Sequence, residues 1–123
     1  MLTTQEVSQY IRLTLKQHKV EVEVEFSDYV WNKRRACGMY FSKEKTIRMS
    51  PRVLKSFALF RYVFLHELAH ALDHKERGDS IWKNRKRSNW HGANFRKLCK
   101  QLDIPTGRFV PRHLFQIFLT DPT

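Results

Sequence analysis

The chain has 123 residues with nine Phe, four Gly and four Pro, which suits one compact core and excludes a disordered protein. Two cysteines cannot form a disulfide framework, and neither a secretory signal nor a membrane-spanning run is evident, so we expect a cytoplasmic protein. The net charge of +11 favours a polyanionic partner such as nucleic acid, with a basic surface that only keeps the protein soluble as the alternative.

The positive charge is concentrated in the middle of the chain. Residues 1–30 carry three basic and five acidic side chains, and residues 101–123 carry two of each. Residues 31–74 carry nine basic and three acidic side chains, and residues 75–100 carry nine and two. We therefore expect a polyanion to bind near the central segments and not near the two ends.

The first half of the chain predicts a helix and a small sheet. Thr3 to Glu6 has the pattern of a capping box, and the apolar spacing after it predicts a helix over about residues 4–18. Three strands follow, the first with alternating Val and Glu and the other two joined as a hairpin. Their predicted ranges are residues 20–26, 36–41 and 46–49. A basic connection over residues 31–35 precedes the hairpin.

The second half predicts helices separated by loops. Serine and proline at residues 50–51 predict a helix start. One long helix, or two helices with a bend near Ser56, should run to Arg77. Residues 78–90 lack apolar periodicity and predict a loop, and a helix over about residues 92–102 follows. Proline and glycine interrupt the tail, so we predict one α+β domain with a three-stranded sheet.

The long predicted helix contains His66-Glu67-Leu68-Ala69-His70, which has the form of a zinc-binding motif. Histidines four residues apart lie on the same face of a helix, so His66 and His70 can bind one metal ion. Glu67 lies beside the first ligand, where it can accept a proton from a metal-bound water. The flanking residues are largely apolar, so these polar groups would be costly to bury without partners. The alternative is that they are satisfied core groups or face solvent.

A third ligand has to come from outside this motif, and His91 is the leading candidate. It precedes Gly92 at a predicted loop-to-helix junction, from which it can approach the helix closely. His74 continues the spacing, but three ligands on one straight helix cannot converge well on a tetrahedral ion. Glu76 stands where a longer zinc motif has its third ligand, without the glycine that this motif requires. His113 in the tail is a further alternative.

Four motifs carry a resemblance to a known family. They are Ala36-Cys37-Gly38-Met39, Ile47-Arg48-Met49-Ser50-Pro51, His66-Glu67-Leu68-Ala69-His70-Ala71 and His91-Gly92-Ala93-Asn94-Phe95. They resemble the SprT-like zinc metalloproteases, which include the bacterial SprT proteins and the Spartan DNA–protein crosslink proteases, over about residues 20–118. Bacterial members usually continue into a zinc ribbon, whereas this sequence has no C-x-x-C pair, so we expect the short form, a single metalloprotease domain over residues 1–123.

The resemblance implies a zincin-like fold and a zinc-dependent peptidase. One Zn²⁺ would be bound by His66 and His70 on the central helix and by His91 at the following helix, with Glu67 as the base. The implied substrates are DNA-associated or DNA-crosslinked proteins, as in DNA repair at the nucleoid, or in the host cytoplasm if the protein is viral. Zinc peptidases often stabilise the oxyanion with a further side chain, for which the sequence offers three unranked candidates: Tyr40, Arg48 and His113.

Two other functions fit parts of this pattern. A peptidase that cleaves one dedicated partner, such as a repressor, usually has an acidic third ligand, which His91 argues against. A non-enzymatic DNA-binding module with a structural zinc would not need a base such as Glu67 beside its ligand.

The sharpest basic cluster lies just before His91. Cations that follow the phosphates and aromatic rings that stack on bases are typical of proteins that bind single-stranded DNA. The DNA-binding residues predicted on this basis are Trp82, Lys83, Arg85, Lys86, Arg87 and Trp90, with Lys33, Arg34 and Arg35 as an extension. The alternative is a solvated loop whose tryptophans cover the core.

Overall fold

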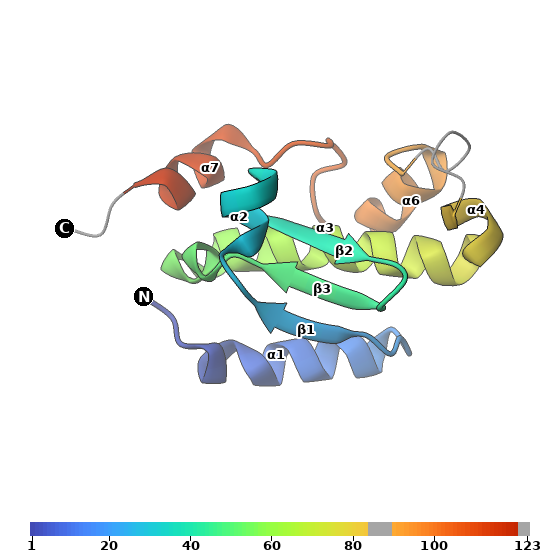
Figure 1. The fold of residues 1–123 in the computed structure, drawn as a ribbon, viewed down its shortest axis with the longest axis horizontal. Coiled ribbons are helices and arrows are strands. Elements are labelled where there is room, and N and C mark those ends of the chain that lie inside the picture. The colour runs from blue at the N-terminus through green and yellow to red at the C-terminus, as the bar shows by residue number, and fades with distance from the viewer. Residues whose placement is uncertain (84–89, 121–123) are drawn as a thin grey trace.

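A three-stranded sheet packs against one long helix in the computed structural model, which describes residues 1–83 and 90–120 (Figure 1). The strands are β1 (Glu23–Phe26), β2 (Gly38–Phe41) and β3 (Thr46–Met49), in the order β1-β3-β2. β3 pairs with β1 in parallel and with β2 in antiparallel orientation, so both outer strands keep one edge free of strand pairing among the described residues. The predicted α+β domain with a three-stranded sheet is confirmed.

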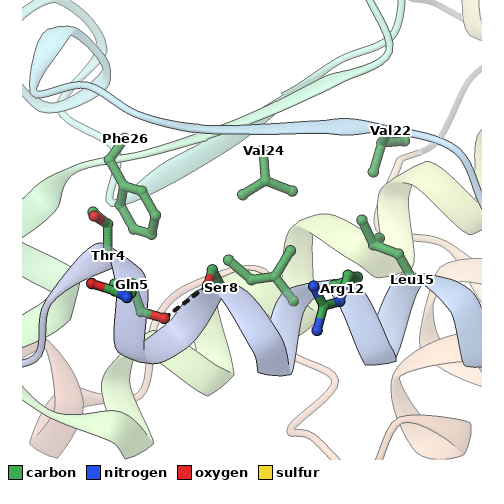
Figure 2. A pocket seen from close by; sticks show the side chains of 9 residues that line it. Thr4, Gln5, Ser8, Arg12, Leu15, Val22, Val24 and Phe26 are labelled. Atoms are coloured by element: carbon green, nitrogen blue, oxygen red, sulfur yellow. Dashed lines mark hydrogen bonds between the residues drawn. The ribbon is translucent and has the colours of Figure 1, made fainter.

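The helix α1 (Thr4–Gln17) lies beside β1 and begins at the predicted capping box of Thr3 and Glu6. Figure 2 shows the shallow groove between the two elements, where Val24 and Phe26 point toward α1. The glutamates of β1 are exposed on the opposite face, as the alternation predicts.

The central helix α3 (Phe57–Arg77) lies behind the sheet and supplies most of the core (Figure 1). Of its 21 residues, 15 are buried, which is why its sequence is apolar on nearly every face. It is preceded by a short 3₁₀ helix (Pro51–Lys55), and Ser56 is extended and caps α3 with its hydroxyl. The bend near Ser56 is therefore confirmed, and the alternative of one continuous helix is wrong. No helix of the described residues is long and apolar enough to cross a membrane.

Three further helices occupy segments for which we predicted a connection, a loop and an interrupted tail. They are α2 (Tyr29–Arg34), α4 (Asp79–Lys83) and α7 (Arg112–Leu119). Each is too short for its sequence period to predict it, and tertiary packing stabilises it instead. The rings of Trp31 in α2 and Phe118 in α7 meet edge to face at 5.0 Å, and Trp82 of α4 is buried. These predictions were therefore wrong because they used local pattern alone.

Candidate metal centre

Three histidine side chains from two segments of the chain come together in the structure. His66 and His70 come from α3, and His91 lies just before α6 (Ala93–Gln101). One ligand nitrogen from each histidine lies within 4.8 Å of the other two. His66 and His70 are buried and His91 is half-buried, so the cluster is open on the His91 side. The structure thus brings together the three ligands expected from the sequence.

The other candidates for the third ligand do not join this cluster. The two ring nitrogens of His74 bond to the Tyr40 hydroxyl at 2.7 Å and to an Asp79 carboxylate oxygen at 2.5 Å. Glu76 is exposed and accepts a hydrogen bond from Asn94, and His113 is exposed on α7. The geometry therefore favours His91.

Packing around Phe95 sets the position of the three rings. Phe95 is 1% exposed and lies against all three, with ring centroids 4.4 Å from His70 and 5.0 Å from both His66 and His91. The Phe95 ring thus packs against all three histidine rings and helps to hold them in position, as expected from its place in the motif. Because Phe95 belongs to α6 and contacts two histidines of α3, it also packs α6 against α3. One side chain thus helps to fix His91 relative to the other two histidines.

A buried polar network joins the same two helices. Asp73 of α3 is fully buried, and its carboxylate accepts two hydrogen bonds from Arg77 at 2.7 and 2.6 Å. It also accepts one from the Asn94 side chain of α6 at 2.6 Å. Asp73 lies about one helical turn after His70, and Asn94 lies three residues after His91. The network is therefore close to two of the three histidines. We did not predict this network from the sequence, although an Asp followed four residues later by an Arg on a helix indicates an ion pair.

Burial keeps the histidines neutral, which is the form that binds a metal. Desolvation, followed by the neighbouring His91, lowers the pKa of His66 to about 4. Desolvation also lowers the pKa of His70 well below its usual value. The pKa of His91 is lowered as well, first by desolvation and second by the positive charge of Arg108. The Nδ1 atom of His70 is buried without a hydrogen-bond partner among the described residues. The cluster is therefore not a self-satisfied polar core, and its three imidazoles suit a metal ion.

Glu67 lies beside the cluster with 7% of its surface exposed. Burial raises the pKa of its carboxyl group from 4.5 to about 8, and a hydrogen bond from the Tyr40 backbone acts in the opposite direction. A carboxyl group with a pKa near neutrality can both accept and release a proton, which is what a general base requires.

These shifts predict how the stability of the metal-free protein depends on pH. The folded-state pKa of Glu67 is about 8 against 4.5 when exposed, so the folded state holds a proton that the unfolded state releases, and stability falls as pH rises between these values. The histidines act oppositely, and their contribution keeps rising until the pH is about one unit above 6.5, the unfolded value. We therefore expect the stability of the wild type relative to a variant without the Glu67 carboxyl group to fall by on the order of 2 kcal/mol between about pH 6.5 and 8.

The matched control for this prediction is Glu67→Gln, which cannot titrate. Urea unfolding of chelator-treated protein at both ends of this pH interval measures the effect. Over this interval Glu67→Gln should gain stability from the histidines alone, and the wild type should fall behind it. An equal change in both proteins would show that Glu67 does not cause the pH dependence.

The histidines and Glu67 line a cleft of about 840 Å³. One wall is formed by β2 with its flanking residues 36–44, and another by Trp82 and Trp90. The tail segment 108–110 closes a third side. Among residues 1–83 and 90–120, Glu44 is the one exposed acidic residue of the lining. Five exposed cations of the same part of the chain line the cleft: Arg34, Arg35, Lys43, Lys83 and Arg108. A strongly basic cleft therefore surrounds the candidate site.

Three of the cations predicted to bind DNA are in this cleft, namely Arg34, Arg35 and Lys83. Lys33 is exposed but is not part of the lining. Arg85, Lys86 and Arg87 lie outside the described residues.

The two tryptophans predicted to stack on bases have different surroundings. Trp82 is 8% exposed, and its ring packs against His70, His74 and Tyr40. Trp90 is half-buried and stacks on Trp82, with ring centroids 5.7 Å apart. The faces of Trp82 are therefore occupied within the protein, and Trp90 is the more accessible of the pair.

The structure separates the three candidates for an oxyanion-stabilising residue. Tyr40 lines the cleft. Arg48 lies on the outer face of the sheet, where it bonds to Glu25 at 2.8 Å and covers the Phe41 ring. His113 is exposed and does not line the cleft. Arg108 does line it and had not been identified from the sequence, because no local pattern places the tail segment there.

Comparison with known families, together with the three clustered histidines, indicates a metallopeptidase-like domain. Residues 4–112 match the model of the SprT-like family, so the chain belongs to the SprT-like family. The resemblance read from the four sequence motifs is thereby confirmed. Neither the search of curated proteins nor the search of solved structures returned a match.

Proposed function

We propose that the protein is a zinc-dependent metallopeptidase with a zincin-like fold that cleaves DNA-associated or DNA-crosslinked proteins. The observation that carries the proposal is that three neutral histidines and a buried glutamate lie together in a basic cleft. Membership of the SprT-like family supports the peptidase activity. The distribution of charge around the cleft supports the choice of substrate.

The donor set suits zinc. Three imidazole nitrogens are a common protein contribution to catalytic zinc sites, which keep a further position open for water or substrate. His66, His70 and His91 would hold the ion, and the half-buried side of the cluster faces the cleft. When bound, zinc supplies Lewis acidity, which lowers the pKa of water and polarises a carbonyl group.

Glu67 would move the proton during the reaction. A positive charge nearby favours the ionised carboxylate, so its pKa would fall from the value of the metal-free protein. A carboxylate oxygen of Glu67 would then accept a proton from the attacking water and deliver it to the nitrogen of the leaving amine. Of the three oxyanion candidates, Tyr40 alone lines the cleft, but its hydroxyl is bonded to His74 at 2.7 Å, so we assign this role to none of the three.

The free edge of β2 provides a way to bind a polypeptide. β2 pairs with β3 on one side, and among the described strands nothing pairs with its other edge. Residues 36–44 line the cleft along this strand. An extended segment of substrate could add to this edge through backbone hydrogen bonds, which read no side chains. Such binding would suit a peptidase whose specificity comes from where its substrates are bound.

The basic lining of the cleft supports DNA as the partner that supplies this specificity. Arg34 and Arg35 lie at the end of α2 and Lys83 at the end of α4, and these two segments meet at one cleft. Cations that face the same cleft as the peptidase site would hold DNA within reach of that site. Cleavage would then be confined to proteins attached to the same DNA, with single-stranded DNA favoured if Trp90 stacks on a base.

We predict that replacing Arg34, Arg35 and Lys83 together with glutamine weakens binding of a single-stranded oligonucleotide. If all three contact phosphates, the slope of log K against log salt should decrease in magnitude by about two, since each contact contributes about 0.7. Fluorescence anisotropy over a salt series measures both quantities.

The matched control removes the same charge elsewhere. Arg12 and Lys16 are exposed on α1, and Lys100 is exposed on α6; none lines the cleft. Their triple replacement with glutamine should change the affinity much less. Equal effects of the two triple variants would mean that net charge, and not the cleft, determines binding.

A further inference from the structure

Tyr62 connects a candidate metal ligand to the tail of the chain. It lies on α3 one turn before His66, and it is 3% exposed, so its ring is part of the core. Its hydroxyl donates a hydrogen bond to the backbone carbonyl of Phe109 at 3.2 Å. The same oxygen lies 3.4 Å from Nδ1 of His66, a long but feasible hydrogen bond.

The direction of these bonds determines the state of His66. A carbonyl oxygen can only accept, so the hydroxyl proton of Tyr62 is committed to Phe109. The Tyr62 oxygen can then accept the proton on Nδ1 of His66, which leaves Nε2 of that ring unprotonated and able to bind a metal. A partner on the second ring nitrogen fixes the tautomer and orientation of a ligand histidine. His70 has no such partner on Nδ1 among the described residues.

The Phe109 carbonyl, which accepts the hydrogen bond from Tyr62, belongs to a segment that forms one wall of the cleft. Arg108 and Phe109 line the cleft, and the Arg108 guanidinium lies 5.3 Å from the centre of the Phe109 ring. The Phe109 side chain is 77% exposed, so packing does little to hold it. Among the described residues, the bond from Tyr62 is the one hydrogen bond that joins residues 105–110 to α3. This wall is therefore attached to the protein next to a metal ligand.

We propose that Tyr62 is a positioning residue that couples His66 to the Arg108–Phe109 wall, so that metal binding and placement of this wall support each other. Such coupling is reciprocal: whatever the wall gains from the metal, the metal gains from the wall. The inference rests on the proposed metal site but not on peptidase activity.

The test compares Tyr62→Phe with Tyr40→Phe, both in the full chain carrying Glu67→Gln so that the protein cannot cleave itself. Each change removes one hydroxyl from the surroundings of the cleft, but the Tyr40 hydroxyl bonds to His74, which is not among the three ligands. Zinc affinity is measured by competition with a chromogenic chelator. Tyr62→Phe should weaken zinc binding about tenfold, as is usual for a partner of a ligand histidine, and Tyr40→Phe should not.

The second readout follows the wall itself. Chymotrypsin cleaves after exposed Phe, so the rate of cutting between Phe109 and Val110, identified by mass spectrometry, reports whether the Phe109 carbonyl is held. Zinc should slow this cut in the parent protein and in Tyr40→Phe, and the protection should be lost in Tyr62→Phe. Circular dichroism verifies that each variant is folded.

Unchanged zinc affinity in Tyr62→Phe, or equal protection by zinc in that variant and the parent, would overturn the coupling while leaving the metal site intact. A parent protein that binds no zinc would overturn the metal site and this inference together. Neither zinc affinity nor the rate of chymotrypsin cleavage depends on peptidase activity. The test therefore stays valid even if the wild-type protein proves to have no peptidase activity.

Discussion

Replacing Glu67 with glutamine is expected to abolish peptide-bond cleavage while leaving the metal content unchanged. Glutamine has nearly the same shape, so the buried position beside the three histidines should accept it. The amide cannot take a proton from water, and loss of a general base usually lowers the rate by about 10²- to 10⁴-fold. The side chain is not one of the three clustered ligands, so the metal should stay bound.

Cleavage is followed by mass spectrometry of the products, and metal content by elemental analysis of the same samples. Glu44→Gln is the matched control, because Glu44 is an exposed carboxylate that lines the same cleft. It should retain activity. Wild-type rates in Glu67→Gln would exclude the proposed base, and loss of metal from it would assign Glu67 a role as ligand.

Replacing His91 with alanine is expected to remove the metal. Only two of the three clustered nitrogens would remain, both on α3, and two imidazoles do not retain zinc against competing chelators. The binding free energy of zinc sites with four ligands implies about 3 kcal/mol per ligand, which corresponds to a loss of affinity of about a hundredfold or more. The fold should persist, because His91 is half-buried and Phe95 continues to hold α6 against α3.

His113→Ala is the control for this prediction, because His113 was a sequence-based alternative and is exposed on α7. Elemental analysis after dialysis against a weak chelator should find metal in His113→Ala and none in His91→Ala. Full metal content in His91→Ala would return the third ligand to Glu76 or His113.

The candidate site could be predicted from sequence where local geometry determines it. The period of a helix brings His66 and His70 to one face whatever surrounds them. His91 could be chosen because a glycine follows it at the start of a helix. The strands could be predicted from alternation and from the hairpin pattern, which is why β3 was placed with the correct bounds. These features depend on residues close together in the chain.

The remaining features depend on contacts between distant residues. Tyr62 and Phe109 are 47 positions apart, and nothing in either segment indicates that they meet. Trp82 was expected to offer its ring to a base, but it is buried against His70 because α4 forms where a loop was predicted. The short helices α2 and α7 likewise depend on each other's aromatic residues. Such packing has no period that a sequence displays.

Cleavage of a basic DNA-binding protein, with and without single-stranded DNA, tests the central claim most directly. The zinc-loaded wild type should cleave this substrate when DNA is present and cleave it far more slowly without DNA, whereas Glu67→Gln should be inactive in both. If the wild type binds zinc and DNA but leaves the substrate intact under both conditions, the protein is not a DNA-guided peptidase. A dedicated protein substrate, or a binding role without catalysis, would then account for the site.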